Sequence, residues 1–301
     1  MNEYHKPVLL EESIEGLNID SQKKQIFVDL TFGGGGHSSF MLQKMNKDSA
    51  LFAFDQDIEA IENSIKDERL ILLESNFRHF NKFLKLFDIN GVDGILADLG
   101  VSSHQFDDGK RGFSYRADEK LDMRMNQKQR MDAILVLNEY SENDLVKIFS
   151  KYGEIRNSKQ LAKKIVQCRQ RFVIDTTGGL INCIESVIRG NKIKYLSQLF
   201  QAVRIEVNDE MGALTDMLNN TRKVLKKGGR LVMMSYHSLE DRLVKNLIKR
   251  GNAEGIIVKD EFGHIDRPFK EVIKGVITAN KDEIESNPRA RSAKLRIAEK
   301  V

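Results

Sequence analysis

The feature that most constrains the fold of this chain is a run of four glycines at residues 33–36. Before it come an apolar run of strand length, residues 26–28, and the acidic residue Asp29. After it, residues 38–45 have the pattern of an amphipathic helix. A strand, an acid, a glycine loop and a helix in this order are typical of a nucleotide-type cofactor pocket at the carboxyl edge of a parallel sheet. Consecutive glycines also let the backbone approach a ligand closely, because no Cβ is in the way.

The spacing within the loop argues against a dinucleotide. The dinucleotide fingerprint needs a third glycine three residues after the second. In this chain Ser38 or Ser39 occupies that position, depending on the register of the match. The loop therefore favours an adenosine-like cofactor over NAD.

The first hundred residues alternate between strand and helix patterns. Such alternation predicts βαβ units, a parallel sheet and helices on both of its faces. The further strands are expected at residues 51–55, 70–73 and 94–98, and the helices between them at 57–66 and 77–87.

The alternation stops at residue 107. Up to about residue 198 no strand pattern occurs, and apolar residues recur at helical spacing. One predicted helix face carries Leu161, Ala162, Ile165, Cys168 and Phe172. We therefore predict a helical insertion at residues 107–198 within a sheet domain made of residues 1–106 and 199–301.

The sheet pattern resumes after a long predicted helix at 198–225, which a lysine and glycine stop at 226–229 is expected to end. A buried strand at 230–235 and a helix at 239–250 follow, then strand patterns at 269–273 and 293–298. The last pattern alternates strictly, as in an antiparallel strand. A parallel core closed by an antiparallel C-terminal strand fits the Rossmann-like α/β fold of class I S-adenosylmethionine-dependent methyltransferases better than that of a dehydrogenase.

The positive charge of the chain is concentrated in two segments. The net charge is only +4, but residues 151–171 hold seven Lys or Arg and one acid, and residues 286–301 hold five and one. Basic surfaces of this kind suit a polyanion. The alternative for each segment is an ordinary solvated helix face.

Composition indicates a chain that stays in the cytoplasm. No apolar run approaches the roughly 20 residues that cross a bilayer, and the N-terminus lacks a basic-then-apolar signal peptide. Cys168 and Cys183 are too few for a disulfide framework or a zinc site, so no metal is expected and both are predicted to be small buried hydrophobes in a reducing compartment.

Acidic residues end the predicted strands, where a cofactor would lie. Asp29 can meet the charged amino-acid end of S-adenosylmethionine, or it can simply end the strand in a turn. Asp55 follows Gly36 by 19 residues, a distance at which an acid typically accepts the ribose hydroxyls; Asp57 is the alternative, or caps the next helix. Phe77 can stack on adenine or belong to the core.

Asp98 ends the fourth strand, at an edge that faces both cofactor and substrate in such folds. Enzymes that methylate exocyclic base amines often carry two prolines and an aromatic residue after this position. None of the three prolines of this chain lies there. Spacing alone therefore leaves the acceptor atom open.

Over a series of short sequence blocks, the chain resembles the MraW-type ribosomal RNA small-subunit methyltransferases. The resemblance implies transfer of a methyl group from S-adenosylmethionine to N4 of a cytidine in the decoding region of 16S rRNA, within the small ribosomal subunit or its precursor. The matching blocks follow the family order over nearly the whole chain and are residues 5–10, 29–37, 94–103, 111–114, 121–125, 152–154, 200–205, 235–242 and 287–292.

The resemblance also implies which residues contact the cofactor. Three departures stand beside it: His104 where the family often has proline, Gly34 where a basic residue is frequent, and residues 192–199, which lack a His-Pro-Ala-Thr-Arg run. The last departure puts in doubt only a substrate contact carried by that run. The implied cofactor contacts are Gly35, Gly36, His37, Asp55, Phe77, Asp98 and Gln105.

For catalysis, we expect Asp98 to accept a hydrogen bond from the amine, and Arg124 or His237 to help position the base or a phosphate. Residues 110–130, rich in charge, would form a lid and, with the basic insertion, hold the RNA backbone. Phe113 or Tyr115 would stack on a displaced base, or pack the insertion onto the sheet. A homodimer is one option for the oligomeric state, which the sequence leaves open.

Overall fold

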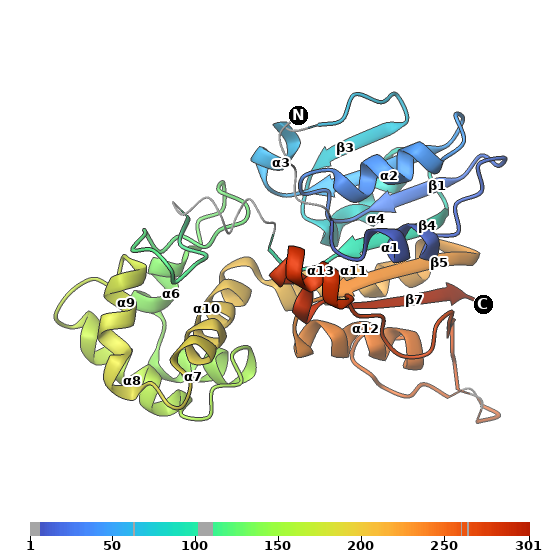
Figure 1. The fold of residues 1–301 in the computed structure, drawn as a ribbon. Helices are drawn as coiled ribbons and strands as arrows, with labels where there is room; N and C mark the ends of the chain where they lie inside the picture. The colour runs from blue at the N-terminus through green and yellow to red at the C-terminus, as the bar shows by residue number, and fades with distance from the viewer. Residues whose placement is uncertain (1–6, 63, 102–110, 260, 264) are drawn as a thin grey trace. The chain divides into compact units, whose positions relative to one another are not determined.

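The computed structural model describes residues 7–301 except 63, 102–110, 260 and 264. The chain divides into two compact units (Figure 1). The sheet unit is Met1–Gly100 with Met211–Val301, and the helical unit is Val101–Glu210. Residues 199–210, which the sequence pattern placed with the sheet, belong to the helical unit.

In the part of the chain that the structure describes, the sheet unit is built on seven strands in the order β3-β2-β1-β4-β5-β7-β6 (Figure 1). The first five in this order are parallel neighbours, whereas β7 runs antiparallel to both β5 and β6. This confirms the predicted parallel core and antiparallel C-terminal strand. The strands are β1 Ile26–Asp29, β2 Ala50–Asp55, β3 Leu70–Glu74, β4 Val92–Asp98, β5 Leu225–Ser235, β6 Phe269–Glu271 and β7 Lys294–Lys300.

The central strands are apolar because both faces of the sheet are covered. Successive side chains point to opposite faces, so Phe27 and Leu51 pack in one core cluster and Val28 and Phe52 in the other. Helices α1 (Leu10–Gly16) and α2 (Gly36–Lys44) supply the first cluster; α4 (Phe80–Leu86), α11 (Glu210–Val224) and α12 (Ser238–Arg250) supply the second. Shorter helical pieces are α3 Ile58–Glu62, η1 Phe77–His79, α13 Lys281–Ser286 and η4 Pro288–Ser292.

The prediction of one long helix at 198–225 is wrong, because the helix is interrupted at Asp209. Asp209 has a left-handed backbone (φ 46°, ψ 43°) and separates α10 (Lys192–Asn208) from α11. Asp tolerates this conformation better than most residues do. The predicted end of the helix before the lysine and glycine segment 226–229 is confirmed, because α11 ends at Val224. The segment itself forms the irregular start of β5, where the register with β4 shifts.

The described residues of the helical unit share one apolar core. Leu161, Ala162, Ile165 and Cys168 are buried in it, as their spacing predicted, whereas Phe172 is 45% exposed because α8 ends at Arg169. Among the described residues between 111 and 210, no β-strand occurs. Its helices are α6 Ala133–Glu139, α7 Glu142–Lys151, α8 Ser158–Arg169, α9 Thr177–Ile184, η3 Glu185–Val187 and α10.

Cys168 and Cys183 form a disulfide between α8 and α9. Both are buried as predicted, but they are bonded to each other, which differs from the expected small hydrophobes in a reducing compartment. Packing of the two helices brings the Cα atoms to 6.1 Å, within the range that a disulfide spans. Within the described part of the chain, none of the helices combines the length and apolar character needed to cross a membrane.

Candidate active site

Three carboxylates mark the carboxyl edge of the central strands. Asp29, Asp55 and Asp98 end β1, β2 and β4, which are direct neighbours in the order β2-β1-β4. Because parallel strands end at the same edge, one short stretch of the sheet gathers all three acids. Burial raises the pKa of each of them, since a low-polarity environment disfavours the charged form.

The carboxylate of Asp29 is hydrogen-bonded within the turn that follows β1. It accepts a hydrogen bond from the Ser38 hydroxyl at 2.7 Å and from the Thr31 backbone N–H at 3.1 Å. The residue is fully buried. This geometry favours the turn role over a contact with the cofactor.

The glycine loop combines open space with tight packing. Gly33 and Gly35 have positive φ values of 52° and 74°, which favour glycine. A Cβ on Gly33 would meet nothing within 4 Å, whereas a Cβ on Gly36 would lie 2.3 Å from the Pro7 ring. One side of the loop is therefore free for a ligand, and the other is closed by the segment near the N-terminus.

His37 ties the loop to the same segment. Its side chain is 5% exposed, and Nε2 lies 3.3 Å from the carbonyl oxygen of Val8. Helix α2 starts one residue earlier, at Gly36, with Gly35 as an N-cap that has no side chain. The first turn of α2 thus presents backbone N–H groups of the kind that hold anionic groups.

Asp55 holds the loop from the next strand. Its Oδ2 accepts the Gly33 N–H at 2.8 Å, and its Oδ1 accepts the Asp57 N–H at 2.9 Å. Burial raises the pKa of Asp55 to about 6, and the neighbouring carboxylate of Asp57 adds to the shift. Asp57 itself accepts the Glu59 N–H at the start of α3, as a helix cap does.

Phe77 follows β3, the edge strand that lies next to β2. It opens η1 after Asn76, whose side chain accepts the Arg78 N–H and donates to Gln56 at 2.8 Å. The Phe77 ring is half-buried against the core of the sheet unit. It therefore has both a packed side and an exposed one. Gln105, the remaining cofactor contact implied by resemblance, lies outside the described residues.

Asp98 is anchored twice. Its backbone N–H donates to the Thr31 hydroxyl at 2.7 Å, and its Oδ1 accepts the Tyr236 hydroxyl at 2.7 Å. Sequence reasoning missed Tyr236, although it lies in the block at 235–242 directly after β5. Because β5 is the neighbour of β4, the residue after β5 reaches the same edge as Asp98.

His237 caps α12. Its side chain accepts the Glu240 N–H, and the Glu240 side chain accepts backbone N–H groups in return, which makes a capping box. Glu240 also accepts the Tyr236 N–H at 2.9 Å. The structure thus gives His237 a defined structural role next to Tyr236.

Arg124 lies in the helical unit, where it organises its own loop. Its guanidinium makes a two-fold contact with Asp122, at 2.7 Å for both nitrogens, and donates to the carbonyl oxygens of Gln127 and Gln129. These contacts hold residues 122–129 in one conformation.

Phe113 and Tyr115 both pack inside the helical unit. Phe113 is 5% exposed in its core, and the Tyr115 ring meets Phe200 edge-on with centroids 5.6 Å apart. The Tyr115 hydroxyl is 3.1 Å from the Ser197 hydroxyl. Phe113 is therefore a core residue with little ring surface to offer a base.

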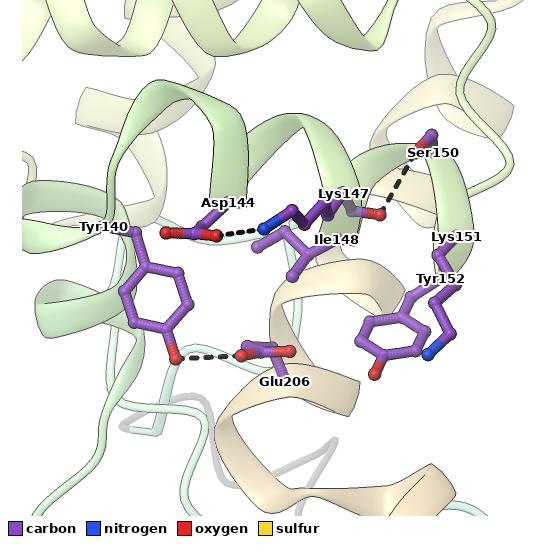
Figure 2. Close-up of a pocket in the computed structure, with 8 residues that line it drawn as sticks. All are labelled: Tyr140, Asp144, Lys147, Ile148, Ser150, Lys151, Tyr152 and Glu206. Carbon is purple, nitrogen blue, oxygen red and sulfur yellow. Dashed lines mark hydrogen bonds and ion pairs between the residues drawn. The ribbon is translucent and has the colours of Figure 1, made fainter.

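A pocket of about 580 Å³ lies in the helical unit (Figure 2). Its polar groups already pair with one another: Lys147 with Asp144 at 2.8 Å, and the Tyr140 hydroxyl with Glu206 at 2.8 Å. Lys151 lies over the Tyr152 ring. This pocket contains none of the residues predicted for the cofactor.

The sheet order, the antiparallel β7, the glycine loop after β1 and the acid at the end of β2 define a class I S-adenosylmethionine-dependent methyltransferase. The model of the MraW methylase family matches residues 2–301. The chain belongs to this family, which is S-adenosylmethionine-dependent.

Relatives resemble the chain over nearly its whole length. The ribosomal RNA small subunit methyltransferase H of Phocaeicola vulgatus is 52% identical over 298 residues, covering 99% of this chain and 97% of that protein. The protein of the same name from Christiangramia forsetii is 49% identical over 300 residues, covering 99% and 98%. A solved rRNA methylase structure from Streptococcus thermophilus covers 100% of this chain and 99% of its own, at 12% identity and a TM-score of 0.41.

Proposed function

We propose that this protein methylates N4 of a cytidine in the decoding region of 16S rRNA. Relatives of about half identity over their full length bear the name ribosomal RNA small subunit methyltransferase H, which supports the RNA class. The observation that carries the choice of an amine is Asp98, a carboxylate held at the substrate edge by Thr31 and Tyr236. A carboxylate in this place can accept the N–H of an exocyclic amine.

The residues of the sheet unit fit the cofactor. Asp55 would accept the ribose hydroxyls, the open side of the glycine loop with Gly35, Gly36 and His37 would hold the amino-acid end, and Phe77 would lie against adenine. Asp98 would complete the pocket of the sheet unit; Gln105, which the resemblance also implies as a contact, lies outside the described residues. When bound, S-adenosylmethionine supplies an electrophilic methyl group.

Catalysis then depends mainly on alignment. Holding two reactants in line can contribute up to roughly 7–11 kcal/mol. Asp98 would accept one N–H of the amine and so direct the nitrogen lone pair toward the methyl group. The amine proton becomes acidic only as the new bond forms, so no strong base is required. Arg124 and His237 would support the base or a phosphate through the loops that they organise.

The helical unit would recognise the RNA. Its segment 151–171 carries the larger of the two basic excesses, and Lys159 and Lys163 of α8 are exposed. Exposed lysines on one element suit the phosphate backbone, which dominates affinity for RNA. The substrate would be the small ribosomal subunit or its precursor in the cytoplasm, with the enzyme acting as a monomer or a homodimer.

The direct test uses labelled S-adenosylmethionine and three acceptors: free 16S rRNA, assembled small subunits, and total protein from cells that lack the gene. The proposal expects label in 16S rRNA, recovered as N4-methylcytidine after nuclease digestion and mass spectrometry. Label on another nucleoside would overturn the position. Label only in protein would overturn the RNA class.

A further inference from the structure

Asp98 and Tyr236 form a pair that connects two neighbouring strands. The Tyr236 hydroxyl donates to Asp98 Oδ1 at 2.7 Å, although the two residues are 138 positions apart. Among the described residues, no hydrogen bond to the other oxygen, Oδ2, is found. The pair therefore distinguishes two oxygens that are chemically equivalent in a free carboxylate.

Both partners are fixed by their backbones. The Asp98 N–H donates to the Thr31 hydroxyl in the turn after β1, and the Tyr236 N–H donates to Glu240 in α12. The Tyr236 ring also covers the chain just after Asp98: a Cβ on Gly100 would lie 3.2 Å from it, and Gly100 has a φ of 111°. Rotation of either side chain would break a contact, so the geometry is set before a substrate arrives.

We propose that Tyr236 is a positioning residue for methyl transfer: its hydroxyl holds Asp98 Oδ1 so that Oδ2 receives the substrate amine. This inference rests on the proposed function. A preorganised acceptor does not have to reorient during the reaction, which lowers the barrier. The phenol also favours the charged carboxylate, because hydrogen bonds to the charged form stabilise it.

Other titratable groups near the pair come from several elements and stay constant in the test. For Asp98 they are Asp29 from β1, His37 from α2 and Glu240 from α12; Glu283 from α13 adds to the field at Tyr236. The pKa of Tyr236 is raised well above its usual value by burial and by the Asp98 charge, so the phenol remains a donor throughout the accessible pH range.

The experiment compares wild type with Tyr236→Phe, which removes only the hydroxyl. We expect kcat to fall about 10-fold or more, with the affinity for S-adenosylmethionine and the KM for RNA within about 2-fold. The acidic limb of the kcat–pH profile should move to higher pH, because Asp98 loses a bond that favours its charged form. Tyr140→Phe is the matched control, since it breaks a phenol–carboxylate bond of 2.8 Å in the helical unit and should leave the profile unchanged.

A second variant keeps the test decisive if Tyr236→Phe does not fold. Tyr236→3-fluorotyrosine retains the ring and makes the phenol a stronger donor, so the acidic limb should move to lower pH. Wild-type kcat and an unshifted acidic limb in the variant that folds would overturn the inference while leaving the proposed function intact. An inactive wild type on small-subunit RNA would instead overturn the proposed function.

Discussion

Asp55 and Gly33 are joined across two parallel strands by a hydrogen bond of 2.8 Å, from the glycine N–H to Oδ2 of the acid. The residue expected to hold the ribose therefore also holds the glycine loop. The two functions depend on the same charge, because a carboxylate accepts hydrogen bonds more strongly than a neutral acid does. Protonation of Asp55 should weaken both at once.

The first prediction concerns the pH dependence of cofactor binding. The pKa of Asp55 is raised to about 6 in the folded protein. Since the charged form is the stronger acceptor, affinity for S-adenosylmethionine should rise with pH through about 6 and level off above it. Titration calorimetry from pH 5 to 8 measures this. Asp55→Asn should bind more weakly at pH 8 and lose most of the pH dependence.

The raised pKa of Asp55 also predicts how the stability of the folded protein changes with pH. The pKa of Asp55 in the folded protein lies above its usual value of 3.8, so the folded state binds this proton more tightly than the unfolded chain does. The contribution of Asp55 to stability should therefore fall as pH rises from about 4 to about 6 and stay constant above. Asp216→Asn, a change in an acid of α11 paired with Arg78, is the control for both measurements and should retain the wild-type binding profile.

A second prediction concerns the glycine loop. Gly36→Ala would place a Cβ 2.3 Å from the Pro7 ring, so the loop or the N-terminal segment must move. We expect affinity for S-adenosylmethionine to fall at least about 10-fold, because a displacement of about 1 Å in a binding element is costly. Gly34→Ala, at an exposed position of the same loop, is the control. Equal affinities of the two variants would contradict the packing argument.

A third prediction concerns Asp98 itself. Asp98→Ala should lower kcat for methyl transfer by about 10² or more, as the loss of a preorganised polar group does in other enzymes. RNA affinity, measured by filter binding, should be largely preserved because RNA is held mainly by phosphate contacts. Unchanged turnover would remove Asp98 from the mechanism.

A fourth prediction concerns the stability of the helical unit. The buried side chain of Asn208 accepts the Met125 N–H and donates to the Met123 carbonyl, both at 2.8 Å. Asn208→Ala leaves these backbone groups without their partner, at about 1–3 kcal/mol each. We expect a drop in Tm of several degrees. Asn143→Ala, at an exposed position of α7, should change Tm by less than a degree or two.

A fifth prediction concerns RNA binding by α8. Replacing Lys163 and Lys164 together by glutamine should make the RNA affinity less sensitive to salt. The slope of the logarithm of the binding constant against the logarithm of the salt concentration should become shallower by about one to two. The matched control neutralises Lys245 and Lys249, two exposed lysines of α12. An unchanged slope in the α8 variant would place the RNA on another surface.

The strands and the acids at their ends were predictable for one reason. A central parallel strand is covered on both faces, so its residues form continuous apolar runs such as 51–54, and the first polar residue marks its end. The helix break at Asp209 carries no such signal, because one left-handed residue leaves the apolar spacing nearly intact. The exposure of Phe172 depends likewise on where α8 ends.

Local patterns in the sequence by themselves determined the strand, acid, glycine loop and helix, the parallel core, the family and hence the methyl donor. These follow from backbone preferences and from burial, which neighbouring residues encode. Only the tertiary structure decided the contacts: His37 on the N-terminal segment, the Cys168–Cys183 pair, and Tyr236 on Asp98. Each joins segments that meet because particular strands or helices become neighbours, and no residue pattern within either segment specifies the partner.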